Sequence, residues 1–169
     1  EVTVGGVTYT AWDTSNVTDM NGTFGGASDF DQDITSWNTS KVNNMSSMFT
    51  RASAFNQDIG TKEVTVGGVT YIAWDTSKVN EFGSTFENAS AFNQDLSSWD
   101  VSSGYHGDDF DANATAWCSS ESLNNGRPLF DDFTPTLPEG CEKYVPAPEC
   151  SDESIDWTTA ATEDGWSCT

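Results

Sequence analysis

Fixed-period repetition constrains this chain more than any other feature of its sequence. The interval from Trp12 to Trp37 recurs between Trp74 and Trp99, and each of these tryptophans opens a Trp-[Asp/Asn]-x-Ser phrase. Two phenylalanine columns follow in the same register: Phe24, Phe49 and Phe86, then Phe30, Phe55 and Phe92. A repeat of about 25 residues cannot bury its apolar side alone, so neighbouring copies have to stack. We therefore expect a solenoid whose aromatic columns form an internal ladder rather than sugar-stacking platforms on the surface.

A nine-residue phrase is also duplicated. Trp37 and Trp74 are 37 residues apart, so twelve residues (37 − 25) are inserted between them. The insertion carries Glu63–Tyr71, which repeats Glu1–Tyr9 without change. Alternating β-branched residues on both sides of a Gly-Gly pair predict a two-residue β-hairpin. The predicted register has an apolar face and a polar face, with these pairs: Val2 with Tyr9, Val4 with Val7, and Thr3 with Thr8.

Two short elements are expected inside each coil. Apolar residues recur at the i, i+3, i+4 and i+7 spacing of a helix face, as in Met45, Met48, Phe49 and Ala52. The Trp-Asp-Thr-Ser-x-Val stretch is typical of a short strand, which would pair in parallel with its counterpart in the next coil. The sequence therefore predicts an α/β solenoid of about 25-residue coils with short parallel strands, short helices, inserted β-hairpins and a disulfide-containing C-terminal tail.

These features divide the chain into three regions. Residues 1–11 form a β-hairpin leading into the first coil, and residues 12–117 form the repeat solenoid with its hairpin insertion at 60–73. The fourth coil is degenerate, with Trp117 in the phenylalanine position, as expected of a C-terminal capping repeat. Residues 118–169 contain all four cysteines and all five prolines, and they form a C-terminal cap or tail that cannot continue the coil.

The phrases Trp-Asp-Thr-Ser-x-Val, Met-x-x-Met-Phe and Ala-x-x-Phe-Asn-Gln-Asp-Ile follow one another in a fixed order, most completely from Trp37 to Ile59. This order is similar to the bacterial surface protein repeat of Mycoplasma-type lipoproteins and BspA-like proteins, and the resemblance spans residues 12–117. It implies a solenoid related to leucine-rich repeats that is displayed on cell surfaces, with roles in adhesion and surface architecture. It implies no catalytic residues.

Charge excludes several classes of partner. The chain has 27 acidic and 6 basic residues, a net charge of −21, so it repels nucleic acid and anionic membranes. No apolar run approaches membrane-spanning length, and the chain reads as a mature or excised segment. A single histidine, His106, assembles neither a catalytic triad nor a histidine-rich metal site, so we expect no enzyme and no required cofactor.

Calcium is the alternative cofactor, because acidic residues cluster at two places. The first is Asp29, Asp31 and Asp33, and the second is Asp108, Asp109 and Asp111. The column formed by Asp33, Asp58 and Asp95 is better explained as turn capping.

Cysteines and sequons indicate an extracellular or cell-surface location. The four cysteines fit no zinc or redox spacing, and we favour the pairing of Cys118 with Cys141 and of Cys150 with Cys168 among three possible pairings. Six Asn-x-Ser/Thr sequons either carry N-linked glycans or reflect the repeat consensus: Asn16, Asn21, Asn38, Asn44, Asn88 and Asn113.

The leading functional hypothesis is a glycosylated structural protein that self-associates into a homopolymer of a surface layer, wall or filament. The alternatives are an adhesin or carbohydrate-binding module and a calcium-dependent surface protein. Self-association would use the apolar face of a hairpin together with the tail after Asp131, because a hairpin on a short solenoid leaves an open edge. The apolar faces are Val2, Val4, Val7 and Tyr9 in the first hairpin, and Val64, Val66, Val69 and Tyr71 in the second. The opposite interpretation is that each hairpin folds back and buries this face on its own coil.

Overall fold

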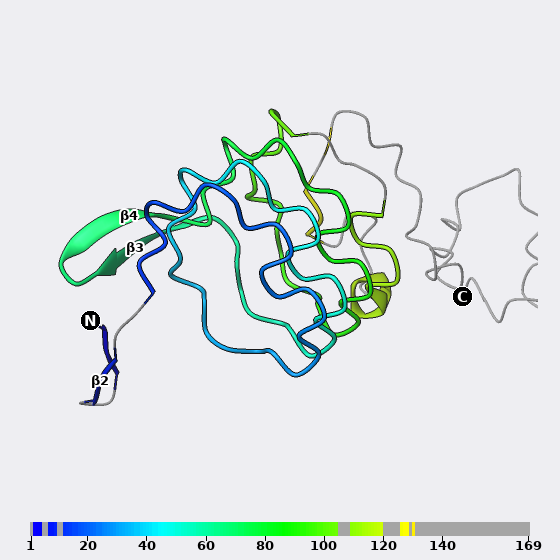
Figure 1. The fold of residues 1–169 in the computed structure, drawn as a ribbon, viewed down its shortest axis with the longest axis horizontal. Coiled ribbons are helices and arrows are strands. Elements are labelled where there is room, and N and C mark those ends of the chain that lie inside the picture. The colour runs from blue at the N-terminus through cyan, green and yellow to red at the C-terminus, as the bar shows by residue number, and fades with distance from the viewer. Residues whose placement is uncertain are drawn as a thin grey trace, which may run out of the picture.

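Regular secondary structure is sparse in the part of this protein that the structure describes. The computed structural model describes residues 2–4, 7–9, 12–104, 109–119, 126–128 and 130. Its elements, in chain order, are β1 (Val2–Val4), β2 (Val7–Tyr9), β3 (Lys62–Val66), β4 (Val69–Ala73) and the 3-10 helix η1 (Thr115–Ser119). The strands form two separate antiparallel hairpins, β1–β2 and β3–β4, which flank the first coils of the chain (Figure 1).

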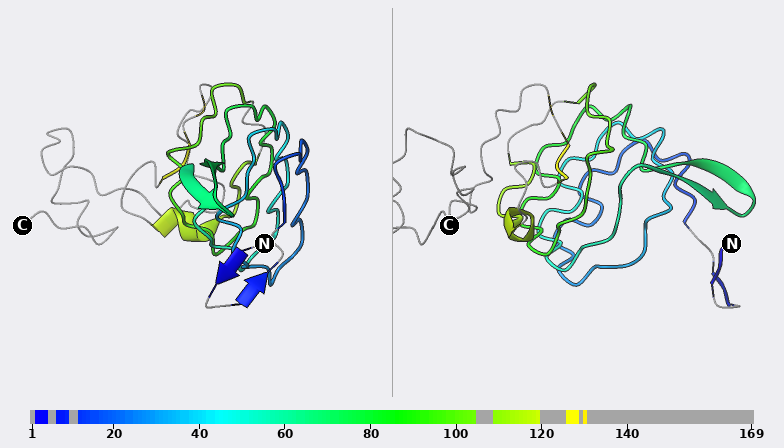
Figure 2. Two further views of the ribbon diagram at one scale, coloured as in Figure 1. Left: turned by 90° about the vertical axis from the view of Figure 1, so that its left-hand side faces the viewer. Right: turned by 180° about the vertical axis from the view of Figure 1, so that it is seen from behind.

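Between these elements the chain winds as a stack of coils, one behind another (Figure 1, Figure 2). The tryptophan column stacks through all four coils, with ring-centroid distances of 5.9 Å for Trp12 and Trp37, 6.4 Å for Trp37 and Trp74, and 6.1 Å for Trp74 and Trp99. The twelve inserted residues leave this column in register because β3 and β4 project away from the stack. The predicted internal ladder is therefore confirmed.

The two phenylalanine columns complete the core. In the first column, the ring centroid of Phe49 lies 5.6 Å from that of Phe24 and 5.4 Å from that of Phe86. In the second column, the ring centroid of Phe55 lies 5.8 Å from that of Phe30 and 5.7 Å from that of Phe92. The rings of the second and third coils are fully buried, whereas those of the first coil are only half-buried. Aromatic rings thus supply much of the interior of a chain that has few aliphatic residues.

Backbone amides join the coils in an alternating pattern that is clearest over residues 45–52. Every second amide donates to the next coil: Met45 to the Glu81 carbonyl, Ser47 to Gly83, Phe49 to Thr85 and Arg51 to Glu87, at 2.8–2.9 Å. The amides of Met48, Thr50 and Ala52 instead donate to carbonyls three residues earlier, at 2.9–3.2 Å. Each coil therefore closes its own turns and binds its neighbour with the same short segment.

The predicted α/β solenoid of the leucine-rich-repeat type is wrong for the part of the chain that the structure describes. No α-helix occurs there, and parallel pairing is reduced to isolated bridges, Asp19 with Asn44 and Asn44 with Glu81. The reason is that every fourth residue of the turn segment has a positive φ, which a right-handed helix excludes. These residues are Gly22 and Gly26, Ser47 and Arg51, Ser84 and Asn88, and Asp109 and Asn113.

The hairpin prediction holds in both copies. β1 and β2 pair Val2 with Tyr9, Thr3 with Thr8 and Val4 with Val7, as the sequence predicted. β3 and β4 repeat these pairs as Val64 with Tyr71, Thr65 with Thr70 and Val66 with Val69. Gly67 and Gly68 both have positive φ, at 58° and 81°, which explains the Gly-Gly turn.

The rings of the aromatic columns change from flat to edge-on packing at the fourth coil. Trp117 does not stack flat on Phe92 but packs edge-on against it, with a ring-centroid distance of 4.8 Å and an angle of 87° between the ring planes. Asp111 stands one period after Phe86, so a carboxylate takes the place of the next phenylalanine and pairs with Arg127. The Arg127 guanidinium also lies 5.5 Å from the centre of the Trp117 ring. Edge-on packing and a buried ion pair thus end the flat stacking of rings.

Two phenylalanines in one column provide a matched test of the ladder. Replacing Phe55 with Ala should lower the free energy of unfolding by about 3–5 kcal/mol, because its fully buried ring packs between two coils. Replacing Phe30 with Ala should cost clearly less, because that half-buried ring packs against a described neighbouring coil on one side only. Urea denaturation measures the free energy of unfolding of both variants. Equal losses of stability would contradict a ladder in which the rings of the second coil are packed on both sides.

Candidate functional site

The column of Asp33, Asp58 and Asp95 caps the turns in which these residues lie. The Asp33 carboxylate accepts the backbone amide of Thr35 at 3.0 Å, Asp58 accepts that of Gly60 at 3.1 Å, and Asp95 accepts that of Ser97 at 2.9 Å. The predicted turn-capping role of this column is confirmed. Hydrogen bonds lower the pKa of all three carboxyl groups, chiefly from Thr35 to Asp33, from Lys62 to Asp58 and from Ser97 to Asp95.

A second column of such turns starts each coil. The residue after each tryptophan accepts the amide of the serine two positions later, at 3.0–3.1 Å: Asp13, Asn38, Asp75 and Asp100. Hydrogen bonds from Ser15 and Ser102 lower the pKa of Asp13 and of Asp100. Side chains of this kind fold back on the local backbone, so the column fixes the path of each turn.

The candidate calcium loop around Asp31 serves instead as a contact between coils. Asp31 accepts the Asn56 amide and the Gln57 side-chain amide, both at 2.9 Å. In the second cluster, Asp111 is held by Arg127, and Asp108 lies outside the described residues together with His106. Among the described residues, no group of three or more His, Cys, Asp or Glu is arranged to hold a metal ion.

The six sequon asparagines fall into three local settings. Asn38 and Asn44 cap turns, where each accepts the amide of the serine of its own sequon. Asn88 and Asn113 both have a φ of 60°, a backbone conformation that Asn adopts more readily than most residues. Asn16 and Asn21 are exposed and contact the second coil through Lys41 and the Ser46 carbonyl. Four of the six positions therefore have a structural reason to be Asn, which the sequon pattern alone did not reveal.

The second hairpin divides the predicted assembly residues into two pairs. Val64 and Tyr71 pack against the core, and the Tyr71 hydroxyl donates to the Ser36 carbonyl of the second coil. Burial raises the pKa of Tyr71. Val66 is half-buried, whereas Val69 at the tip is 64% exposed. The inner pair is thus used on the chain's own coil, and the outer pair remains at the surface.

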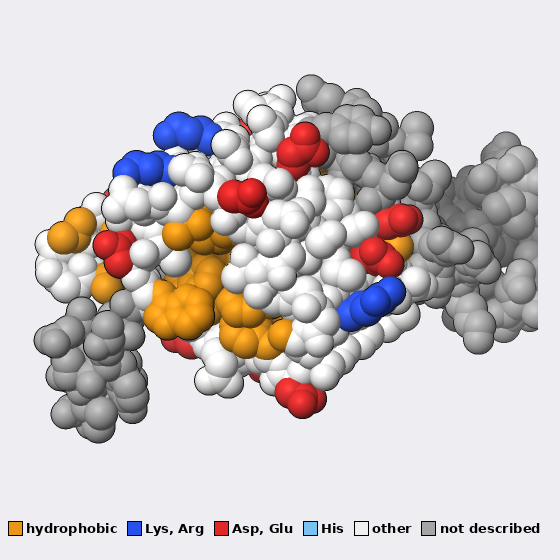
Figure 3. All heavy atoms as spheres, in the orientation of Figure 1, with side chains coloured by type: hydrophobic (Ala, Val, Ile, Leu, Met, Phe, Trp, Pro, Cys, Tyr) orange, Lys and Arg blue, Asp and Glu red, His pale blue; other side chains and the backbone are white. Residues whose placement is uncertain are grey.

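The exposed large hydrophobic side chains among the described residues all belong to the first coil or the second hairpin: Trp12, Val69 and Ile72. Trp12 is 70% exposed, since one face of its indole packs on Trp37 and no described coil covers the other. Figure 3 shows hydrophobic side chains at the end of the stack from which β3 and β4 project. We call this set of three residues the head patch.

Several predicted site residues lie outside the described part of the chain. They include the side chains of the first hairpin, Val2, Val4, Val7 and Tyr9, although its backbone pairing is described. Cys118 belongs to η1, but its side chain is not described, and neither are Cys141, Cys150 and Cys168. The disulfide pairing therefore stays a prediction. No helix in the described residues is both long and apolar enough to cross a membrane.

Comparison with known proteins identifies a family. The family model described as "Mycoplasma protein of unknown function, DUF285" matches residues 5–125, which cover all four coils and the second hairpin. No curated protein and no solved structure gives a significant match.

Proposed function

This chain belongs to the DUF285 family, and we propose that it is a non-enzymatic extracellular building block of a surface layer, wall or filament. The observation that carries the proposal is the head patch, in which Trp12, Val69 and Ile72 stay exposed at one end of a stack. Large apolar side chains gathered on a surface favour a contact with another protein. Within this family we propose the more specific relationship to BspA-like surface repeats, which agrees with such a role.

The stack itself suits a structural role. Most of its described rings pack between coils, and the carboxylates of Asp33 and Asp31 hold a turn and a contact between coils. The turn segments of the first three coils repeat the same hydrogen bonds, so length can be added without a new kind of contact. A repeated scaffold with an uncovered end is what a polymer subunit requires.

An adhesin or carbohydrate-binding module is the second candidate, and one observation favours it. The exposed indole face of Trp12 could stack on a sugar ring, since aromatic faces offer flat apolar contact area. The other described tryptophans are buried in the stack and could not do so. This alternative therefore depends on a single side chain, whereas assembly can use the whole head patch.

Assembly through the hairpin face is tested by a charge substitution on the full chain in its native form. Replacing both Val66 and Val69 with Lys should dissociate the polymer and leave the monomer folded, because these residues lie at the hairpin tip. The matched control replaces Thr65 and Thr70 with Lys, because they are the neighbouring cross-strand pair on the opposite face of the hairpin. Sedimentation velocity measures particle size, and a wild-type chain that stays monomeric at high concentration contradicts the proposed function.

Glycosylation is tested by intact-mass measurement before and after enzymatic deglycosylation. We expect glycans on at least Asn88 and Asn113, which occupy equivalent coil positions and would direct their sugars to the same side of the stack. Asn38→Asp keeps the turn-capping oxygen and removes the sequon, so it should change neither stability nor mass beyond the substitution itself. An unchanged mass after deglycosylation of the wild-type chain would mean that the sequons are only repeat consensus.

A further inference from the structure

The stack of coils has a direction that is set by its backbone. The positive-φ residues of the turn segment point their amides toward the next coil in the chain. Gly22 donates to the Ser46 carbonyl at 3.0 Å, and Ser47 donates to the Gly83 carbonyl at 2.9 Å. Asn88 continues the series by donating to the Ala112 carbonyl at 2.7 Å. Along this edge, donors therefore face one end of the stack and acceptors face the other.

At the first coil no described residue covers the acceptors of this edge. Asn21 and Gly25 stand one period before Ser46 and Thr50, and the carbonyls of Ser46 and Thr50 accept amides from the coil before them. The Asn21 and Gly25 carbonyls accept no backbone amide from the described residues, and both residues are exposed. We call these two carbonyls, together with the head patch, the head of the stack.

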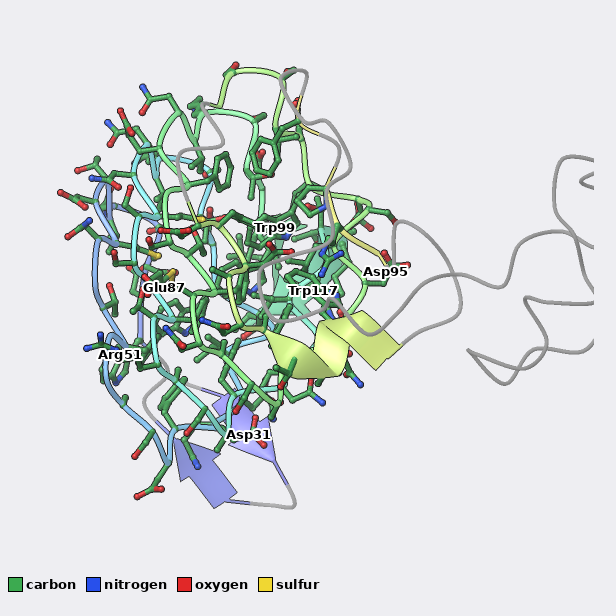
Figure 4. The ribbon with its side chains drawn as sticks, turned by 90° about the vertical axis from the view of Figure 1, so that its right-hand side faces the viewer. Asp31, Arg51, Glu87, Asp95, Trp99 and Trp117 are labelled. Carbon is green, nitrogen blue, oxygen red and sulfur yellow. The ribbon has the colours of Figure 1, made fainter. Side chains whose placement is uncertain are left out.

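At the fourth coil no described residue covers the donors of the same edge. Asp109 and Asn113 stand one period after Ser84 and Asn88 and share their positive φ, at 65° and 60°. Their amides donate to no backbone carbonyl in the described part of the chain, and both residues are exposed. We call this pair of amides the tail edge. In Figure 4 the corresponding edge of the inner coils, marked by Arg51 and Glu87, lies away from Trp99 and Trp117.

Head and tail edge match in spacing and in chemistry. Two donors four residues apart face outward at one end, and two acceptors four residues apart face outward at the other. Inside the stack, amides and carbonyls at these same positions bond between neighbouring coils. We propose that a second copy of this chain docks head to tail, with the Asp109 and Asn113 amides donating to the Asn21 and Gly25 carbonyls of the next copy. This proposal rests on the proposed function, and it names the contact.

The directionality also selects the kind of symmetry. A two-fold contact between two heads would place acceptors along this edge opposite acceptors, which gains no hydrogen bond. A head-to-tail contact uses two different surfaces, so each added copy exposes a new tail edge and the polymer can continue to grow. The contact runs along the edge rather than across the core, because Asp111 and Arg127 end the aromatic column.

The side chains at the contact allow docking and offer a test. In the docked register, Asp109 faces Gly22 of the next copy, as Gly22 faces Ser47 within the stack. A Cβ added at Gly22 meets no described atom within 4 Å, and non-glycine residues already occupy the equivalent positions with the same sign of φ. A chain with a non-glycine residue at position 22 should therefore fold normally, and the new side chain should lie beside Asp109 of the neighbouring copy.

Gly22→Asp in the full chain tests the contact by placing a carboxylate beside Asp109. The dissociation constant for assembly, measured by sedimentation, should rise by about tenfold, which corresponds to about 1.4 kcal/mol. Gly22→Asn is the matched control, because it has the same shape and backbone strain without the charge, and it should assemble like the wild-type chain. Adding Asp109→Lys to Gly22→Asp should restore assembly.

Each outcome decides a different point. If the wild-type chain assembles and Gly22→Asp assembles equally well, the head-to-tail contact is overturned and the proposed function stands. The contact is likewise overturned if Asp109→Lys fails to rescue a weakened Gly22→Asp chain, or if assembly closes at two copies. A wild-type chain that never assembles, at low or high salt, overturns the proposed function itself. Thermal unfolding of each variant shows whether the fold is retained.

Discussion

The structure depends on backbone amides that alternate between two partners. In the turn segments of the first three coils, one amide closes a local turn and the next reaches the neighbouring coil, so the same short segment provides both sets of bonds. A single hydrogen bond contributes only about 1 kcal/mol net, and a ring pair contributes a similar amount beyond the area it buries. Stability must therefore come from repetition, in which the first three coils contribute the same bonds and the same rings.

This dependence explains why the ends of the stack matter. An inner coil has neighbours on both sides, and its rings are fully buried. The first coil packs against a described neighbour on one side, which leaves Trp12 exposed and Phe24 and Phe30 half-buried. At the other end, Trp117 turns edge-on and the Asp111–Arg127 pair replaces the next phenylalanine. One end is thus built to finish the core, while the other leaves its core side chains partly uncovered.

The sequence was sufficient to predict the features with a strict period or a strong turn signal. The three aromatic columns and the hairpin register depend on residue identity and spacing alone, and both predictions are confirmed. The helix prediction was wrong because Met45, Met48, Phe49 and Ala52 fit two different structures. The i, i+3, i+4, i+7 spacing is also that of consecutive four-residue turns, each with a positive φ at its third residue.

A signal for those turns was present in the first coil. Gly22 and Gly26 stand four residues apart, and glycine is the residue that most readily adopts a positive φ. In the other coils these positions hold residues such as Ser47 and Arg51, for which the conformation is uncommon and which conceal the pattern. The turn-capping role of the carboxylates could be predicted because they recur at the same position of each coil. The hydrogen bond from the Tyr71 hydroxyl to the Ser36 carbonyl could not, because it joins residues far apart in the sequence.

The alternation of amide partners is tested most directly by the scalar coupling between an amide nitrogen and the carbonyl carbon to which it is hydrogen-bonded, measured by NMR on a chain labelled with ¹⁵N and ¹³C. We expect a coupling from the Ser47 nitrogen to the Gly83 carbonyl carbon and from the Arg51 nitrogen to that of Glu87. Couplings from these nitrogens to carbonyl carbons four residues earlier in the chain, as in an α-helix, would contradict the alternation.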